Sequence, residues 1–385
     1  MAKYIVFCAD GTWSGLGEGD GSDQVQPDAT NVLRLFAALD GRITEESLRK
    51  RDEQEKIAYA ADGEPAQVAK YLHGVGDSGN AIRKILGGVF GEGFIERIVR
   101  GYTFVSRNYA AGDRIVLAGF SRGAYTVRAL AGMITRMGLL PVDAMLGEDG
   151  RYDQERAYRL GIHVWARYRE QAGKKSTLLG YLTEFKGEAI ALNRLLPDVP
   201  IDTVAVWDTV GSLGIPVHDG TDANRVDVFQ FADLALSPRV GAGFHALAID
   251  EQRADFAPTL WEPREGVVQR WFCGAHSDVG GGGAPSNFFS ASALRWMIGK
   301  LAARGVMFGP QAEPVVPADY CQVRASYRDP PFDLRPHALR QLPADVLFHP
   351  SVQVFLTNFA PYSAEVLQAW LPGGSRQLEA ARLSE

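Results

Sequence analysis

The five residues from Gly119 to Gly123 read Gly-Phe-Ser-Arg-Gly, a G-x-S-x-G spacing that can present a serine as a nucleophile. An apolar, strand-like run precedes them, and a helical pattern begins immediately after them. A turn this sharp strains the serine and crowds its neighbours, so the positions two residues on either side need glycine. The turn would raise the Ser121 oxygen above the sheet edge, at a helix N-terminus that favours developing negative charge. The alternative is a tight turn with no chemical role.

A serine hydroxyl attacks well only when a base takes its proton and an acid orients that base. For a nucleophile of this kind the expected chain order is serine, acid, histidine. His276 is the candidate base, because it ends the last clear strand pattern and a glycine-rich loop follows it. Asp208 and Asp250 are the candidate acids, since each ends a strand pattern at the edge where open α/β sheets place ligands. Small residues after Asp208 favour it, whereas Arg253 suggests a structural ion pair for Asp250.

Four other histidines fit the role of base less well. His245 begins a strand pattern and should lie at the opposite edge of the sheet. His218 lies in a loop near the catalytic edge, and His349 follows the last clear strand, where it would order a loop. His73 precedes the serine, against the expected chain order.

An oxyanion hole requires two backbone N–H groups aimed at one point. The first is predicted at Arg122, the residue after the serine. The second is predicted at Gly11 or Thr12, because the loop after the first strand supplies it in such sites. Gly11 would allow close approach of the backbone, and Asp10 would brace the turn. The alternative is an ordinary Asp-Gly turn.

Alternating strand-like and helical stretches must position these groups. Near-continuous apolar strands separated by helices predict a mostly parallel central sheet with helices on both faces. With the serine turn, this pattern predicts an α/β-hydrolase fold. The strand patterns cover residues 3–11, 55–63, 113–121, 201–208, 244–250 and 266–276, and the main helical patterns cover residues 28–41, 92–109 and 122–134.

We predict a single domain over residues 1–385, with a helical cap inserted at about 142–200 and a C-terminal extension at about 284–385. The charged segment 42–56 is expected on the surface. Apolar residues of the cap suggest either a cap core or contact with an apolar substrate. They are Trp165, Tyr168, Leu178, Leu179 and Tyr181.

The composition limits the classes of partner and ligand. A net charge of −6 argues against nucleic acid, because phosphate binding needs a basic surface. The glycine-rich stretches 17–21 and 74–79 lack the features of phosphate-binding loops, so we interpret them as flexible loops. No histidine–carboxylate cluster has metal-ligand spacing, and no metal or cofactor is expected. Cys8 and Cys273 are expected to be small buried hydrophobic residues.

The first residues contain an apolar run too short for a signal peptide, and no stretch approaches the length of a membrane-spanning helix. We therefore expect the chain to fold in the cytoplasm by default. Export by a route that needs no signal peptide stays open, and nothing in the sequence indicates an oligomeric state.

Several segments, in this order, resemble one family: FCADGTW, TNV, YLHGVGDSG, GFSRGAYTVRALAGMI, VWDTVGSLG, FHALAIDEQRADFAPTLW and RWFCGAHSDVGGG. The resemblance is to the uncharacterised α/β-hydrolase domain family numbered 2235 among domains of unknown function. That family includes the catalytic domain of the type VI secretion phospholipase effectors of the first lipase group. The resemblance implies a triad of Ser121, Asp208 and His276, which favours Asp208 over Asp250.

These observations predict a serine hydrolase that cleaves carboxylic esters, with a lipid-like substrate as for a lipase, phospholipase or esterase. Contact with a membrane surface would accompany such a substrate. The second hypothesis is a non-catalytic module of hydrolase fold that binds a lipid or a partner protein. An intact triad distinguishes the two, because a binding module has no need of one.

Overall fold

The strand patterns assemble into one eight-stranded sheet with the order β2-β3-β4-β1-β5-β6-β7-β8. Every neighbouring pair from β4 to β8 is parallel, whereas β2 and β3 join antiparallel at one edge. The predicted fold class, a mostly parallel sheet of the α/β-hydrolase type, is confirmed. The strands are β1 Tyr4–Ala9, β2 Arg42–Ile43, β3 Glu53–Tyr59, β4 Pro65–Leu72, β5 Arg114–Phe120, β6 Ile201–Trp207, β7 Val240–Ala248 and β8 Val267–Phe272.

The structure is a computed structural model of the whole chain. The residues it describes are 2–11, 29–47, 53–73, 92–171, 189–210, 235–282, 288–310, 322–329, 332–334, 336–358, 362, 365–371 and 376–385.

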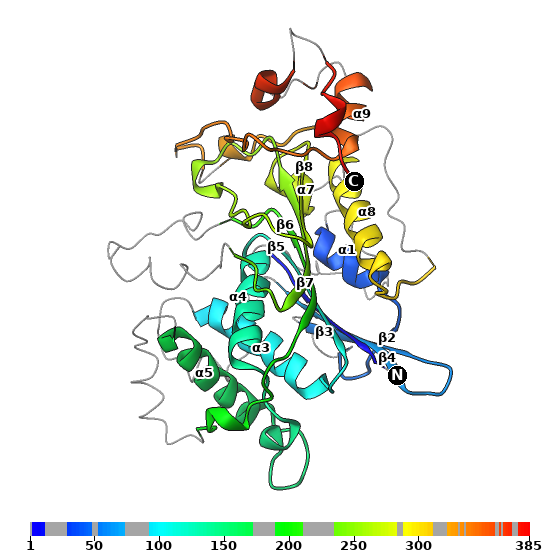
Figure 1. Cartoon of the computed structure of the whole chain (residues 1–385), viewed down its shortest axis with the longest axis vertical. Helices are drawn as coiled ribbons and strands as arrows, with labels where there is room; N and C mark the ends of the chain where they lie inside the picture. Colours follow the sequence, from blue (N-terminus) through cyan, green and yellow to red (C-terminus); the bar gives the residue numbers. More distant parts are fainter. Residues whose placement is uncertain are drawn as a thin grey trace.

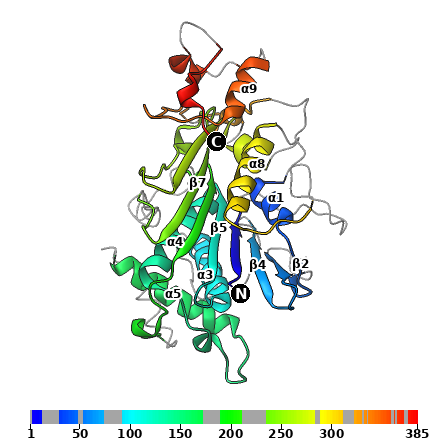
Figure 2. The ribbon, with the colours of Figure 1, turned by 45° about the vertical axis from the view of Figure 1, so that its right-hand side comes forward.

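Helices cover both faces of the sheet (Figures 1 and 2). One face carries α3 and α4, with α5 packed outside them, and the other carries α1 and α8. Two shorter helices also follow β8, with α7 before α8 and α9 after it. The helices are α1 Asn31–Ala38, α3 Glu92–Asn108, α4 Arg122–Met137, α5 Gln154–Gln171, α7 His276–Gly280, α8 Phe288–Ala303 and α9 Pro350–Asn358.

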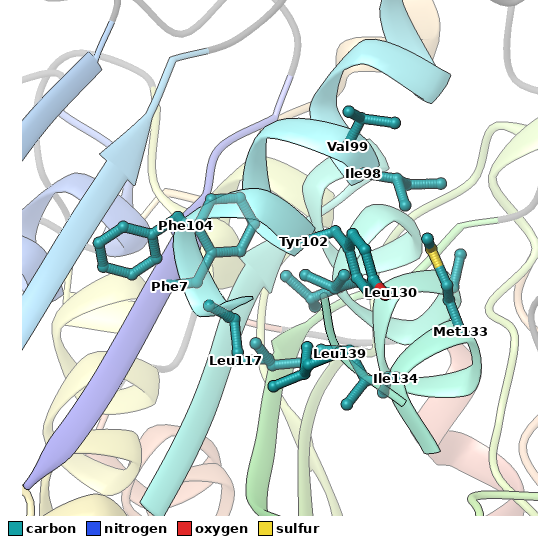
Figure 3. Packing of buried hydrophobic residues seen from close by; sticks show 14 of the residues in the cluster. Phe7, Ile98, Val99, Tyr102, Phe104, Leu117, Leu130, Met133, Ile134 and Leu139 are labelled. Carbon is teal, nitrogen blue, oxygen red and sulfur yellow. The ribbon is translucent and has the colours of Figure 1, made fainter. Parts of the chain in front are cut away.

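Alternation along the central strands divides the core between the two faces. In β1, Ile5 and Phe7 point to the α3–α4 side, while Val6 and Cys8 point to the α1–α8 side. Figure 3 shows the first of these clusters, in which Tyr102 of α3 packs among side chains of α4 and the sheet. Both layers are therefore tightly held around β5, the strand that leads to the candidate nucleophile.

Part of the predicted cap can be placed. The helix α5 packs on α3 and α4, and Trp165 and Tyr168 are buried in the core there. Of the two interpretations, core packing is therefore the correct one for these two residues. Residues 189–200 contain a short 3₁₀ turn, Leu192–Arg194, where the sequence predicted a longer helix. Leu178, Leu179 and Tyr181 lie outside the described residues.

The surface expectation for the charged segment 42–56 is confirmed for Arg42, Glu45 and Glu46, which are exposed, and is wrong for the end of the segment, while residues 48–52 lie outside the described residues. The end of the segment forms β3, in which Glu53 and Lys56 are buried. The Lys56 ammonium donates to the carbonyls of Phe36, Ala37 and Leu39, at 3.0, 2.8 and 3.2 Å. These carbonyls end α1, where the helix dipole favours a cation. The buried Lys56 ammonium is thus stabilised by these three carbonyls.

The C-terminal extension packs against β8, the last strand of the sheet, and forms backbone hydrogen bonds with it. Trp271 of β8 donates its N–H to the Leu347 carbonyl at 3.1 Å and accepts from the His349 N–H at 3.0 Å. Phe348, between them, is fully buried in a third apolar cluster with Leu247 and Trp271. Figure 1 shows this part of the chain gathered beyond β8.

Candidate active site

The turn between β5 and α4 has the strained geometry that the G-x-S-x-G spacing predicts. Ser121 lies at φ 55° and ψ −120°, in a region that non-glycine residues rarely adopt. A Cβ on Gly119 would lie 2.5 Å from the Gly123 carbonyl oxygen. A Cβ on Gly123 would lie 2.0 Å from the carbonyl oxygen of Ala9. Both positions therefore need glycine, and the reason is backbone crowding.

The structure brings Asp208 and His276 together at the same sheet edge as Ser121. The His276 Nδ1 and the Asp208 Oδ2 are 2.6 Å apart. The Ser121 N–H donates to the carbonyl of Trp207, the residue before Asp208, at 3.2 Å. The ring of Phe120, next to Ser121, lies 4.6 Å from the His276 ring, centroid to centroid. All three predicted residues are buried, and they follow β5, β6 and β8 in the chain.

His276 differs from its prediction in one respect, because β8 ends at Phe272 and His276 does not end the strand. It is the first residue of α7, and its backbone N–H donates to Glu251 Oε2 at 3.2 Å. Glycines follow with positive φ at Gly281 and Gly282, where the chain turns away from the site. The contact with Glu251 thus holds the start of this short helix.

Arg340 binds the carboxylate of Asp208 from the other side. Its Nη1 lies 2.7 Å from Oδ1 and its Nη2 lies 2.9 Å from Oδ2, a bidentate pair. Asp208 is fully buried, and burial alone would raise the pKa of its carboxyl. The charges and hydrogen bonds of Arg340 and His276 outweigh burial and hold that pKa well below its usual range. These contacts therefore favour the ionised form of Asp208.

The pKa of His276 is shifted downward. Burial is the main cause, and the nearby Arg253 adds to it, while the hydrogen bond and charge of Asp208 oppose it. Neutral imidazole is the form that can accept a proton from a hydroxyl. The aromatic rings of Phe120 and Phe256, the second at 5.1 Å, flank the imidazole.

Asp250, the alternative acid, has different partners. Its Oδ2 accepts from the Gly274 N–H at 2.6 Å and from the Tyr362 hydroxyl at 2.8 Å. Burial raises the pKa of its carboxyl to about 6. The suggested ion pair with Arg253 is wrong, because Arg253 pairs with Glu251 at 2.8 Å. Asp250 thus braces the loop that leads from β8 to His276.

The oxyanion groups can be placed in part. Arg122 is the first residue of α4, so its N–H is one of the unpaired donors at a helix N-terminus. Gly11 lies beside Ser121, since a Cβ on Gly11 would be 3.4 Å from the Ser121 Cβ. However, the Gly11 N–H already donates to the Asp10 carboxylate at 2.6 Å. Thr12, the other predicted donor of this loop, lies outside the described residues.

Asp10 braces that loop as predicted. Its Oδ2 accepts from the hydroxyls of Thr30 and Tyr71, each at 2.6 Å, and Thr30 also caps α1. Burial raises the pKa of the Asp10 carboxyl to about 6 despite these hydrogen bonds. Arg97 donates to the Asp10 carbonyl and, at 2.8 Å, to the His73 carbonyl. The end of β1 is therefore held from both faces of the sheet.

Two of the other candidate histidines, His245 and His349, have partners of their own. His245 lies in the middle of β7 rather than at its start, and its Nε2 accepts from the Thr209 N–H at 3.1 Å. It therefore supports the loop after Asp208, and burial lowers its pKa to about 3. His349 orders its own loop, since its Nδ1 lies 2.8 Å from the Ser351 hydroxyl. His218 lies outside the described residues.

Sequence reasoning missed three residues that contact the Asp208–His276 pair. Arg340 lies 132 positions beyond Asp208, and no local pattern distinguishes it from other arginines. Glu251 and Phe256 lie in the segment after β7, where the charged run that begins at Asp250 was the available signal.

Comparison with known proteins identifies the family. The model of the family described as "T6SS, Phospholipase effector Tle1-like, catalytic domain" matches residues 3–300. The chain belongs to this family. The predicted resemblance is thereby confirmed. This Tle1-like chain is also 31% identical to the uncharacterized protein YEL023C of Saccharomyces cerevisiae over 151 residues, which are 36% of this chain and 18% of that protein.

Three solved structures resemble the Tle1-like chain. One is an uncharacterized protein from Pseudomonas aeruginosa, with 19% identity, a TM-score of 0.46, and coverage of 82% of this chain and 48% of that chain. Another is the Tle1 effector bound to the VgrG spike of the type 6 secretion system, with 17% identity, a TM-score of 0.38, and coverage of 74% and 53%. The carboxylesterase Cest-2923 from Lactobacillus plantarum WCFS1 has 13% identity, a TM-score of 0.34, and coverage of 80% and 88%. The Tle1-like chain thus spans about half of the first two.

Within the described ranges, no group of three or more histidine, cysteine or carboxylate side chains could hold a metal ion. In the same part of the chain, no helix combines the length and hydropathy needed to cross a membrane. Cys8 and Cys273 are buried, as predicted, and neither is in a disulfide.

Proposed function

We propose that this Tle1-like domain is a serine hydrolase that cleaves carboxylic esters of lipid-like substrates. The observation that carries the proposal is the buried Asp208–His276 pair beside a strained serine at the carboxyl edge of the sheet. An ionised acid, a neutral imidazole and a serine on a sharp turn are the groups that acyl transfer requires. Family membership supports the same class of chemistry.

The reaction would proceed through an acyl-enzyme. His276 Nε2 takes the hydroxyl proton of Ser121 while the Ser121 oxygen forms a bond to the ester carbonyl carbon. The N–H of Arg122 stabilises the negative oxygen of the tetrahedral intermediate. As the ester C–O bond breaks, the imidazolium gives its proton to the leaving alcohol. Water, deprotonated by His276, then releases the carboxylic acid and restores Ser121.

Asp208 accepts the Nδ1 hydrogen of His276 throughout this sequence. The 2.6 Å contact holds the tautomer in which Nε2 is the free base, and the carboxylate stabilises the imidazolium while it exists. Asp208 does not itself take the proton, since Arg340 keeps its pKa well below the usual range.

The apolar surroundings of the imidazole favour an apolar substrate. Phe120 and Phe256 flank His276, and the ring of Phe332 lies 5.6 Å from that of Phe256. Aromatic walls of this kind suit an acyl chain better than a small polar acid. A substrate of this class lies at a membrane surface, so peripheral contact with lipid belongs to the same proposal.

The test compares wild type with Ser121→Ala on short esters, long esters and phospholipids, together with labelling by a fluorophosphonate. We expect wild type to be labelled at Ser121 and to hydrolyse esters, and Ser121→Ala to do neither. Ser351→Ala, on α9, is the matched control and should keep both properties. Folded wild type that neither labels nor hydrolyses any ester would support the non-catalytic binding module instead.

A further inference from the structure

Arg340 belongs to the C-terminal extension, beyond the residues 3–300 that the family model matches. Its guanidinium nevertheless completes the candidate active site. We propose that Arg340 is a positioning residue for the hydrolytic reaction, which keeps the Asp208 carboxylate ionised and oriented toward His276 and so extends activity to lower pH. This inference rests on the proposed serine hydrolase function.

The hydrogen bonds of Arg340 fix the plane of the carboxylate. Nη1 donates to Asp208 Oδ1 at 2.7 Å and to the Ala248 carbonyl at 2.6 Å. Nη2 donates to Asp208 Oδ2 at 2.9 Å and to the Phe256 carbonyl at 2.7 Å. The two carbonyls therefore hold the guanidinium itself in place. Only arginine offers this planar pair of donors, and a lysine ammonium could not reproduce it.

The remaining contacts of Asp208 complete the arrangement. Oδ1 also accepts from the Ala248 N–H at 3.0 Å, while Oδ2 faces His276 Nδ1 at 2.6 Å. Each oxygen thus has two partners, and the carboxylate cannot turn without losing several of them. Its backbone lies at φ 36°, an unfavourable value for aspartate, so these contacts also hold a strained residue.

A purely structural ion pair would not involve the catalytic base. Here the same carboxylate is shared between Arg340, which is permanently charged, and His276, which must gain charge during the reaction. The positive charge of Arg340 offsets part of the attraction between Asp208 and an imidazolium. His276 therefore stays neutral, and able to accept a proton, to a lower pH than it would beside a lone carboxylate.

Other charged groups also face His276, and the test leaves them unchanged. The Glu251 carboxylate accepts a hydrogen bond from the His276 backbone N–H, and Arg253 forms an ion pair with Glu251. On α7 itself, Asp278 is buried and pairs with Arg324. Since none of these contacts involves Arg340, a change in the pH profile of an Arg340 variant reports on the Asp208–His276 pair.

The experiment measures the second-order rate constant for fluorophosphonate labelling of Ser121 between pH 4.5 and 9. This rate needs a neutral His276 but no knowledge of the natural substrate. The proteins are wild type, Arg340→Met, Arg340→Lys and the control Arg382→Met. Arg382 lies in the same extension and donates to the carbonyls of Ala344 and Val346 at 2.8 and 3.4 Å.

For Arg340→Met we expect labelling at neutral pH to fall by about tenfold or more, because the carboxylate is free to turn. The acidic limb of the pH–rate profile should move to higher pH by about one unit, because the positive charge beside the Asp208–His276 pair is gone. Arg340→Lys keeps the charge and loses the planar fork, so it should label more slowly with an acidic limb near that of wild type. Arg382→Met should match wild type in both respects.

Thermal unfolding of each variant separates folding from positioning. If Arg340→Met does not fold, Arg340→Lys decides the matter, and wild-type labelling rates for that variant would overturn the inference. A folded Arg340→Met with the wild-type acidic limb would overturn it as well, since Arg340 would then be structural only. Folded wild type that does not label would overturn the proposed function and this inference together. Wild-type labelling rates in Arg340→Lys, or a wild-type acidic limb in Arg340→Met, would overturn only this inference and leave the proposed function standing.

Discussion

Replacing Asp208 by asparagine isolates the charge of the proposed catalytic acid. In the transition state His276 carries a positive charge, and Asp208 Oδ2 lies 2.6 Å from its Nδ1. For charge centres about 4 Å apart and an effective dielectric constant of about 20, the attraction is worth about 4 kcal/mol. That energy corresponds to about a 10³-fold change in rate. An asparagine also permits the wrong imidazole tautomer, so we expect kcat to fall by about 10³–10⁴-fold.

The same substitution has a second effect, which the structure assigns to Arg340. With Asp208 neutral, the buried guanidinium loses its only carboxylate partner among the described residues. Removing one partner of a buried ion pair destabilises a protein by about 3–5 kcal/mol. The double variant Asp208→Asn/Arg340→Met removes the unpaired charge, so we expect it to recover much of the free energy of unfolding without recovering activity.

The assay is steady-state hydrolysis of a chromogenic ester, with urea unfolding measured on the same samples. Asp250→Asn is the matched control, because Asp250 contacts Gly274 and Tyr362 rather than His276. It should keep kcat within about threefold, since its effects would be confined to stability. Equal losses of kcat in folded Asp208→Asn and Asp250→Asn would refute the assignment of the acid. So would a folded Asp208→Asn with more than a tenth of the wild-type kcat.

Three further predictions concern stability. Gly123→Ala forces a Cβ to 2.0 Å from the Ala9 carbonyl oxygen, so the free energy of unfolding should drop by about 3 kcal/mol or more. The control is Gly299→Ala, which has open space around it and should be neutral or slightly stabilising. Urea unfolding measures both variants. Asp250 has a folded pKa of about 6 against an ordinary 3.8, so its protonated form stabilises the fold below pH 4 and this contribution is lost as pH rises through 6. Wild type should therefore lose about 2–3 kcal/mol more unfolding free energy between pH 4 and pH 8 than Asp250→Asn does. The same pH dependence in both proteins would contradict this. Trp165→Ala should lose about 3–5 kcal/mol with no change in acyl-chain preference, and an altered preference would contradict its place in the core.

The candidate nucleophile was predictable because its signal is local. Two glycines, an apolar strand before Ser121 and a helix after it all lie within a few residues, and each has a steric reason. The base and acid were predictable to within a few choices, because strand ends of a parallel sheet meet at one edge. Both Asp208 and Asp250 follow apolar strands, so the residues after each of them gave only a preference for Asp208, and the family resemblance strengthened it.

The antiparallel edge of the sheet was less predictable, because its partners are distant or unusual. The strand β3 contains Glu53 and Lys56, whose charges suggested a surface segment. Burial is tolerated only because Lys56 meets the last carbonyls of α1 and Glu53 meets Lys70 of β4 at 2.6 Å. The strand β4 was missed altogether, and its pairing with β1 and β3 is a tertiary contact that no local pattern reveals.

The strand-end carboxylates show where sequence patterns cease to determine chemistry. Asp10, Asp208 and Asp250 are all buried, and each follows an apolar strand. Burial raises the pKa of Asp10 and of Asp250 to about 6, although both accept several hydrogen bonds. Asp208 alone has a guanidinium bound to both carboxylate oxygens, and its pKa is held well below the usual range. Hydrogen bonds from neutral donors do not separate the three residues, whereas the charges and hydrogen bonds of Arg340 and His276 act together on Asp208. We therefore expect variants of Arg340 to affect the proposed chemistry more than variants of any neutral neighbour of Asp208.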